Sequence, residues 1–108
     1  MLSKKNRADK KVIGEIFKEG RFLNSPNLTF KFILNRDSSI PRLSFITPKN
    51  IAKFAVKRNL LRRRGYAALR KHIKQFPVRI KGVFIFKKYQ SDVSILEDEI
   101  KNILNKIN

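Results

Sequence analysis

A long stretch of this chain contains no carboxylate. Residues 51–90 carry 13 Lys and Arg and no Asp or Glu, and no acid lies between Asp37 and Asp92. A helix or strand formed here therefore has no acids of its own with which to pair its cations. Because an evenly solvated protein surface intersperses both signs of charge, the basic character is expected to belong to one surface of the fold, not to the chain as a whole.

Composition limits the class of protein further. The chain has 108 residues, 42% of them hydrophobic, which suits one domain (1–108) with a modest core. A formal net charge of +18 is self-repelling and favours a polyanionic partner. With no Cys and a single His, disulfide scaffolds, thiolate nucleophiles, Cys-based zinc sites and His clusters are excluded. Since no membrane span or signal peptide is found, we expect a cytoplasmic nucleic-acid binder with no membrane contact.

The N-terminal half is predicted to form a helix and a strand hairpin after a basic arm at residues 1–8. Apolar residues at helical spacing follow Asp9, which could cap the helix, and Gly20 could end it. Residues 28–34 alternate, and one face of this strand holds Leu28, Phe30, Phe32 and Leu34. Residues 35–39 are typical of a hairpin turn, with 42–47 as the returning strand.

The C-terminal half is predicted to be helix, strand and helix. Residues 51–74 have helical periodicity, with an apolar face made of Phe54, Leu61, Ala68 and Leu69. The continuous apolar run 82–86 indicates an interior strand covered on both faces. Residues 94–97 have capping-box spacing and open an amphipathic helix, whose acidic polar face argues against membrane docking. This order of elements predicts an α/β two-layer sandwich.

The helix in residues 51–74 carries the strongest functional signal. Its cations cover about half of its circumference, and a ridge at i, i+4 spacing beside the apolar face contains Arg58, Arg62, Tyr66 and Arg70. Guanidinium groups suit phosphate oxygens, and one ring could stack on a base. Because no acid lies within the helix, we expect it to contact RNA or DNA.

Other signals have a simpler structural reading. Residues 81–86 faintly resemble an RNA-recognition strand, but core packing is favoured, and no GxxG indicates a KH domain. His72 is expected to be a packing residue instead of a catalytic base. The acids near residue 95 could form a metal cluster, but they more simply begin a helix: Asp92, Glu97, Asp98 and Glu99. The sequence therefore predicts no catalytic residue and no metal site.

Several segments together resemble one known family. Residues 55–63, Ala-Val-Lys-Arg-Asn-Leu-Leu-Arg-Arg, are similar to the Ala-Val-x-Arg-Asn-x-x-Lys/Arg-Arg signature of the bacterial ribonuclease P protein subunit. Residues 48–53, Pro-Lys-Asn-Ile-Ala-Lys, resemble the family's Ser-Lys-Lys-Val/Ile-Gly-x lead-in to that helix. Residues 5–7 and 16–20 resemble its basic arm and first helix. The similarity runs over nearly the whole chain.

The resemblance implies a particular fold. The family's elements follow the order helix, three strands, helix, strand, helix around a central mixed sheet. The fold is of the ribosomal-protein-S5-domain-2-like type and has a left-handed βαβ crossover. A short strand is then expected within residues 21–25. The chain departs from the family where Leu60 and Tyr66 replace usual arginines, where one extra residue falls near 53–54, and where Ile13 replaces an aromatic residue.

The resemblance also implies a function. The family's protein subunit assists removal of the 5′ leader from precursor tRNA, while the RNA subunit carries out the hydrolysis with bound Mg²⁺; no small-molecule substrate is implied. Residues expected to face the ribonuclease P RNA are Lys49, Lys53, Lys57, Arg58, Asn59, Arg62, Arg63 and Arg70. Residues expected to bind the leader are Phe17, Thr29, Lys31 and Ile33. The strand alternation independently leaves Thr29 and Lys31 off the core face.

Two other functions use the same basic helix. A small ribosomal protein would bind ribosomal RNA with no part in any reaction, and the Arg58-Asn59 motif with its Lys49 lead-in argues against it. A DNA-binding helix is disfavoured because no dimerisation element or recognition-helix turn is apparent.

Overall fold

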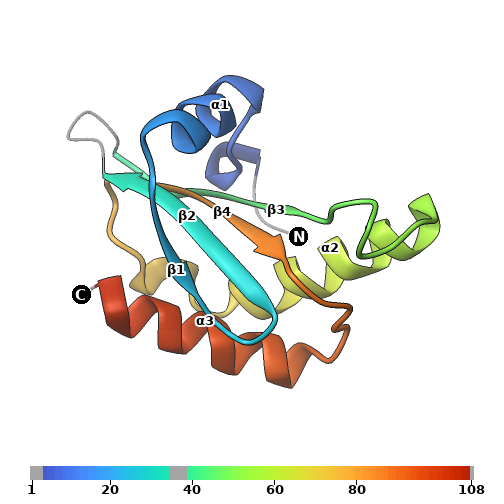
Figure 1. Ribbon diagram of the computed structural model, residues 1–108. Helices are drawn as coiled ribbons and strands as arrows, with labels where there is room; N and C mark the ends of the chain where they lie inside the picture. The colour runs from blue at the N-terminus through green and yellow to red at the C-terminus, as the bar shows by residue number, and fades with distance from the viewer. Residues whose placement is uncertain (1–3, 35–38, 108) are drawn as a thin grey trace.

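The elements follow the expected order. The computed structural model describes residues 4–34 and 39–107, drawn in Figure 1. The chain forms in turn η1 (Lys4–Asn6), α1 (Lys10–Glu19), β1 (Arg21–Asn24), β2 (Leu28–Leu34), β3 (Arg42–Ile46), α2 (Ala55–Arg70), η2 (Ile73–Gln75), β4 (Ile80–Phe86) and α3 (Val93–Ile107). The α/β class and the short strand expected within residues 21–25 are both confirmed.

The described residues form a mixed sheet in the order β1-β2-β4-β3. β4 pairs antiparallel with β2 and parallel with β3, so that Phe30, Phe84 and Phe45 lie in one row across the sheet. The predicted hairpin between residues 28–34 and 42–47 is therefore wrong, because β4 lies between these two strands. The apolar run of β4 is covered on both faces, which requires a central position. Most of the predicted turn at 35–39 lies outside the described residues.

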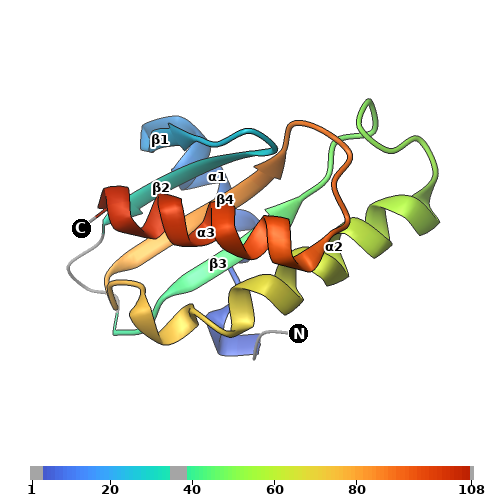
Figure 2. The same ribbon diagram turned by 90° about the horizontal axis from the view of Figure 1, so that it is seen from below.

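The connection from β3 through α2 to β4 is the unusual feature of this topology. The two strands are parallel neighbours, and α2 crosses beneath the sheet between them. Figures 1 and 2 together show that the crossover is left-handed. Nearly all such units have a right-handed crossover. A left-handed crossover is therefore a specific feature, and this chain has the one that the resemblance implies.

The larger core lies between the sheet and the pair α2 and α3, which run side by side across one face (Figure 2). Its centre is a row of stacked rings, with Phe84 4.3 Å from Phe30 and 4.9 Å from Phe45 between centroids. Gly82 makes room for this row, because a Cβ there would lie 2.4 Å from the Phe30 ring. Leu34, predicted on this face, is exposed at the end of β2.

The opposite face of the sheet is covered in part by α1 (Figure 1). Val12 and Ile16 of α1 pack with Val83 of β4 in a second, smaller apolar cluster. The Asp9 side chain accepts a hydrogen bond from the Val12 backbone N–H at 2.9 Å, and Gly20 follows the last residue of the helix. Both predicted boundaries of this helix are confirmed.

The second helix is shorter than the sequence suggests. α2 begins at Ala55 instead of residue 51 and ends at Arg70, with the separate turn η2 in place of its predicted last residues. Its first turns project beyond the strand ends in Figures 1 and 2. Phe54 precedes them and is 67% exposed, so its predicted place on the apolar face is wrong. The helical periodicity of apolar residues continues to Phe54. The sheet ends before this point, so Phe54 has no strand to pack against.

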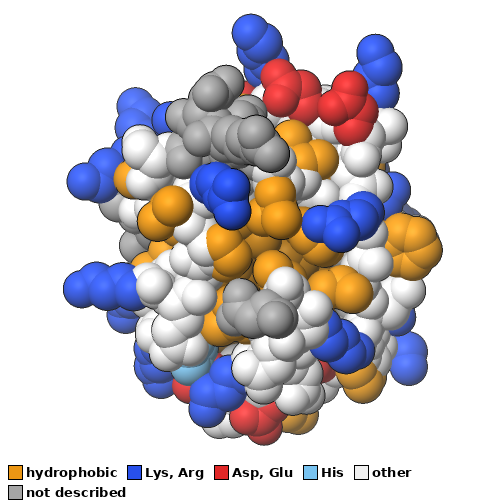
Figure 3. Space-filling model, turned by 90° about the vertical axis from the view of Figure 1, so that its left-hand side faces the viewer, with side chains coloured by type: hydrophobic (Ala, Val, Ile, Leu, Met, Phe, Trp, Pro, Cys, Tyr) orange, Lys and Arg blue, Asp and Glu red, His pale blue; other side chains and the backbone are white. Residues whose placement is uncertain are grey.

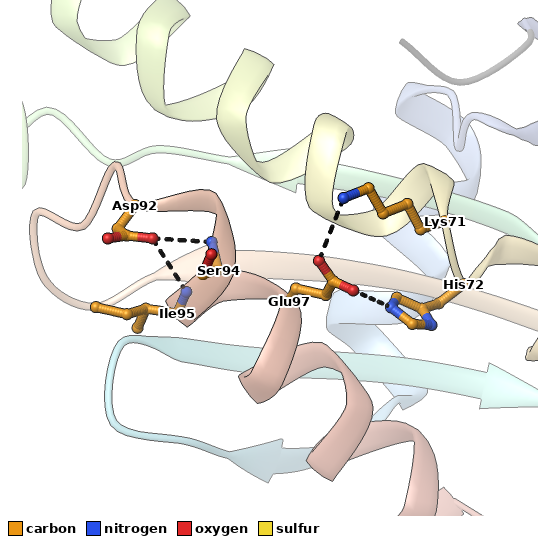
Figure 4. A network of polar contacts seen from close by, with 6 residues as sticks. All are labelled: Lys71, His72, Asp92, Ser94, Ile95 and Glu97. Atoms are coloured by element: carbon orange, nitrogen blue, oxygen red, sulfur yellow. Dashed lines mark hydrogen bonds and ion pairs between the residues drawn. The ribbon is translucent and has the colours of Figure 1, made fainter.

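The last helix is capped by a residue other than the one predicted. Asp92 Oδ1 accepts hydrogen bonds from the backbone N–H groups of Ser94 at 2.8 Å and Ile95 at 3.3 Å, as Figure 4 shows. Glu97, the expected partner of Ser94 in a capping box, instead contacts His72. The capping box is therefore wrong, because Asp92 takes the cap position in place of Ser94 and the helix begins at Val93, two residues earlier than a Ser94 cap requires.

Candidate nucleic-acid interface

The apolar side of α2 fixes which of its cations face solvent. Leu61, Ala68 and Leu69 are fully buried against the sheet and α3. At Gly65 the helix approaches β3 so closely that a Cβ would lie 2.6 Å from the Phe45 ring. The expected RNA-subunit contacts lie away from this seam, and all are exposed or half-buried: Lys49, Lys53, Lys57, Arg58, Asn59, Arg62, Arg63 and Arg70.

A hollow of about 480 Å³ brings three of these residues together. It is lined by Asn59, Arg62 and Arg63, with Val56 and Tyr66 completing the wall. An Arg62 Nη2–H donates to Asn59 Oδ1, which holds the guanidinium beside the amide. Two guanidinium groups and an amide along one helix face can donate to adjacent phosphate oxygens. Lys57 projects from a different side of the helix by its position in the 3.6-residue repeat.

Arg58 has a different role from Arg62. Its Nη1 donates to the backbone carbonyl of Lys53 at 2.7 Å and to that of Ala52 at 3.1 Å. The guanidinium therefore holds the loop before α2 against the helix, while Arg58 itself stays half-buried. The sequence indicated a phosphate ligand here, and the structure shows that this side chain also orders the loop carrying Lys49 and Lys53.

Tyr66 is not free to stack on a base, contrary to the sequence-based expectation. Its side chain is only 7% exposed, and its ring packs edge-on against Phe45 at 5.2 Å between centroids. The Tyr66 hydroxyl accepts a hydrogen bond from the Phe45 backbone N–H at 3.2 Å. β3 is an edge strand, so this hydroxyl satisfies a backbone donor that no neighbouring strand reaches.

The sequence predicts a basic N-terminal arm but not that the arm extends the basic surface of α2. Ala8 N–H donates to Ser44 Oγ at 3.0 Å, and this hydroxyl donates back to the Ala8 carbonyl at 2.9 Å, so the arm lies along β3. A hollow of about 300 Å³ there is lined by Lys4, Arg7 and Tyr66, among others. Since both hollows share Tyr66, the arm continues the surface of α2. Residues 1–3 of the predicted arm lie outside the described part.

The expected leader-binding residues lie on the other face of the sheet. Lys31 Nζ is 5.0 Å from the centroid of the Phe17 ring, which joins β2 to α1, and Phe17 is 45% exposed. The Thr29 hydroxyl donates to Asn24 Oδ1 at 2.8 Å. Ile33 is half-buried and packs against the α1 cluster. The structure thus brings Phe17 and Lys31 together and places Ile33 largely beneath the helix.

Phe22 is a candidate that the sequence analysis missed. It is 61% exposed and lies opposite Lys31 in the pairing of β1 with β2, hence on the same sheet face. Lys31 therefore has an exposed phenylalanine on β1 and another on α1. The signal was the short run Arg21-Phe22-Leu23, but its face could be assigned only once the register with β2 was known.

Glu97 and Glu99 of the C-terminal part have structural partners. Glu97 Oε1 lies 3.0 Å from His72 Nε2, and Glu97 Oε2 lies 3.6 Å from Lys71 Nζ (Figure 4). The hydrogen bond with His72 is the main cause that lowers the pKa of Glu97 below its ordinary value, and Lys71 lowers it further. The buried Glu99 accepts hydrogen bonds from Ser25 and Asn27.

These contacts concern two alternatives from the sequence, a metal cluster of acidic residues and a catalytic His72. Within residues 4–34 and 39–107, no group of three His, Asp or Glu side chains is arranged to hold a metal ion. His72 is buried between α2 and α3 and bonded to Glu97, which agrees with a packing role. No helix in the same ranges is long and apolar enough to cross a membrane.

A separate apolar area lies at the end of the molecule away from the start of α2. Figure 3 shows apolar side chains near the centre of this face, with Lys and Arg around them. A hollow of about 320 Å³ there is lined by residues of three segments: Asn6, Ser39, Ile40, Pro41, Ile73, Lys74, Phe76 and Val78. None of the expected RNA or leader contacts belongs to it.

Comparison with known proteins decides the family. The family model for ribonuclease P matches residues 2–108. The chain belongs to the ribonuclease P protein family. The ribonuclease P family takes part in maturation of the tRNA 5′ end, so the chain is a subunit of the tRNA-processing ribonucleoprotein and has an RNA partner. No match is found among curated protein sequences.

Solved ribonuclease P proteins share the fold. The RNase P protein from Thermotoga maritima is 24% identical with a TM-score of 0.81, over 94% of this chain and 97% of that one. A Staphylococcus aureus RNase P protein is 16% identical with a TM-score of 0.77, over 94% and 93% of the two chains. At these identities the likeness shows the fold, while the family model shows the family.

Proposed function

We propose that this chain binds the ribonuclease P RNA through α2 and the 5′ leader of precursor tRNA through the opposite sheet face. The observation that carries the proposal is the outward basic surface of α2 on a ribonuclease P fold. Across the helix and its flanking loops the cations have no acid within the stretch to pair with. An RNA backbone supplies the missing negative charge.

The RNA-subunit contact is assigned to the α2 side of the molecule. Asn59, Arg62 and Arg63 would donate to phosphate oxygens, and Lys4 and Arg7 would extend the contact across Tyr66. Neutralising crowded phosphates lowers their mutual repulsion, so the chain would stabilise the folded RNA at low Mg²⁺. The fixed pair of Arg62 with Asn59 reduces the side-chain entropy lost on binding.

The leader contact is assigned to β1, β2 and α1. Lys31 would provide a point charge that a flexible single strand can meet in several registers. Phe17 and Phe22 would offer ring faces to its unstacked bases. Thr29 would add a hydroxyl at the rim, whereas Ile33 would support α1 from below.

The chemistry is assigned to the RNA subunit, as the resemblance implies. That RNA would supply bound Mg²⁺ for phosphodiester hydrolysis. The part proposed for this chain is to bind, neutralise and position RNA. We place the reaction in the cytoplasm, with precursor tRNA as the substrate.

Reconstitution tests the proposal. The chain is added to the ribonuclease P RNA of the same genome, and precursor-tRNA cleavage is measured at low Mg²⁺. We expect cleavage to rise on addition of the wild type and of Lys106→Ala, an exposed α3 control that removes the same charge. Arg63→Ala is expected to need more protein for the same rate. Co-purification with ribosomes and no stimulation of cleavage would favour the ribosomal alternative instead.

A further inference from the structure

Phe54 is a large apolar side chain without a structural role that explains it. It is 67% exposed and occupies the N-cap position of α2, but its side chain makes no capping hydrogen bond. Polar residues that accept a hydrogen bond are preferred at this position. A ring placed here therefore forgoes both a cap and burial.

The loop before α2 holds Phe54 in a defined place. Ala52 is buried, and Ile51 packs against the larger core. Arg58 bonds the carbonyls of Ala52 and Lys53, the two residues before Phe54. The Phe54 carbonyl accepts hydrogen bonds from the Lys57 and Arg58 backbone N–H groups at 3.1 Å. A backbone fixed on both sides presents the ring without a large ordering cost on binding.

Charge around the ring identifies the partner. Lys53 Nζ lies 6.0 Å from the Phe54 ring centroid, and Lys57 follows on the first turn of α2. A second copy of this chain would bring another +18 charge to the same place. RNA offers phosphates for these cations and a flat base for the ring, which fits both features at once.

We propose that Phe54 stacks on an unpaired nucleobase of the RNA bound by α2. This inference rests on the proposed function, in which that RNA is the ribonuclease P RNA. The ring would add a base contact to a surface that otherwise reads the phosphate backbone. It would thereby fix the position of α2 along the RNA.

Substitution at Phe54 tests the contact by affinity. We expect Phe54→Ala to weaken binding to the ribonuclease P RNA about tenfold, the scale of one lost base–aromatic stack. Phe54→Leu keeps apolar area without a ring and should also bind more weakly, whereas Phe54→Trp should bind like the wild type. Binding of Phe54→Ala or Phe54→Leu within twofold of the wild type would overturn the inference, provided their thermal melts match.

Fluorescence gives an independent readout, since the chain contains no Trp. We expect the added RNA to quench the emission of Phe54→Trp strongly. The matched control is Val78→Trp, at a 56% exposed position beside Arg79. Both residues belong to the turn before β4, and Figure 1 shows the start of β4 at the opposite end of the molecule from the start of α2. Equal quenching of the two would contradict stacking at Phe54.

The remaining outcomes separate the inference from the proposed function. A wild type that does not bind the ribonuclease P RNA overturns both. A wild type that binds while Phe54→Ala binds equally well overturns the inference alone. Concentration-dependent dimers of the RNA-free chain that Phe54→Ala abolishes, seen by sedimentation, would show that the ring serves a protein contact instead.

Discussion

Two arginines of the same helix ridge differ in what holds them. Arg58 bonds two backbone carbonyls of the preceding loop, whereas the Arg62 guanidinium bonds the exposed Asn59 side chain. The sequence places both at i, i+4 spacing and makes them equivalent. The carbonyl partners arise from the loop's path, which helical periodicity does not encode.

Arg58→Ala and Arg62→Ala are therefore expected to separate stability from binding. Both should weaken RNA-subunit binding by about 1–3 kcal/mol, the scale of lost charged hydrogen bonds. Only Arg58→Ala should also lower the free energy of unfolding, by about 1–2 kcal/mol, because its loop loses two hydrogen bonds. Urea unfolding and RNA titration of both variants check this. Equal unfolding free energies would show that the Arg58 contacts do not stabilise the loop.

The lowered pKa of Glu97 predicts how the free energy of unfolding changes with pH. Its hydrogen bond with His72 lowers its pKa in the folded state, so the contact stabilises the fold above the pKa of the unfolded chain. That stabilisation is lost as the pH falls through the lowered folded pKa. We expect Glu97→Gln to be less stable than the wild type near neutral pH, with the gap closing below about pH 4. Urea unfolding over a pH series measures it, and a constant gap would contradict the ionic contribution.

At the scale of elements, local pattern predicts the helices and strands but not their partners. β2 and β4 follow from alternation and a continuous apolar run, and α1 follows from Asp9 and Gly20. The insertion of β4 between β2 and β3 does not follow, because pairing depends on chain segments far apart in sequence. The α2 cations follow from the sequence pattern. Phe22, the buried position of Tyr66 and the continuity of the arm with α2 do not, because each depends on a neighbouring strand.

The cap of α3 provides a test at this scale. Asp92→Ala should lower the free energy of unfolding by about 1 kcal/mol, because two backbone N–H groups lose their acceptor. Ser94→Ala should change it by less than about 0.5 kcal/mol, as for an ordinary surface substitution. Thermal or urea unfolding of the pair distinguishes the observed cap from the capping box at residues 94–97. A larger loss of unfolding free energy for Ser94→Ala than for Asp92→Ala would favour the capping box instead.

At the scale of the whole molecule, charge is divided between two faces. The basic surface of α2 lies on one side, the arm lies along the β3 edge, and Lys31 with its two phenylalanines lies on the other side. The sheet between them is packed on both sides. In the proposed function, one small chain would thereby hold two RNA segments apart.

The net charge predicts how RNA binding responds to salt. Affinity for the ribonuclease P RNA should fall steeply, with a log–log slope of about −0.7 to −0.9 for each phosphate neutralised. Arg63→Ala should make the slope shallower by about one such unit, and the α3 control Lys106→Ala should leave it unchanged. Titrations at several salt concentrations measure the slopes. A nearly flat dependence would contradict an electrostatic interface.

The division into two faces is tested most directly by measuring both kinds of RNA binding for one variant of each face. The affinity of the wild type, Arg62→Ala and Lys31→Ala proteins is measured for the RNA subunit. The particle reconstituted with each protein is then titrated with precursor tRNA that carries a leader and with mature tRNA. Lys31→Ala should weaken precursor binding by about 1 kcal/mol, as for one partly solvated phosphate contact, and leave mature tRNA and RNA-subunit binding unchanged. Arg62→Ala should weaken RNA-subunit binding alone. Equal losses for precursor and mature tRNA with Lys31→Ala would contradict the account.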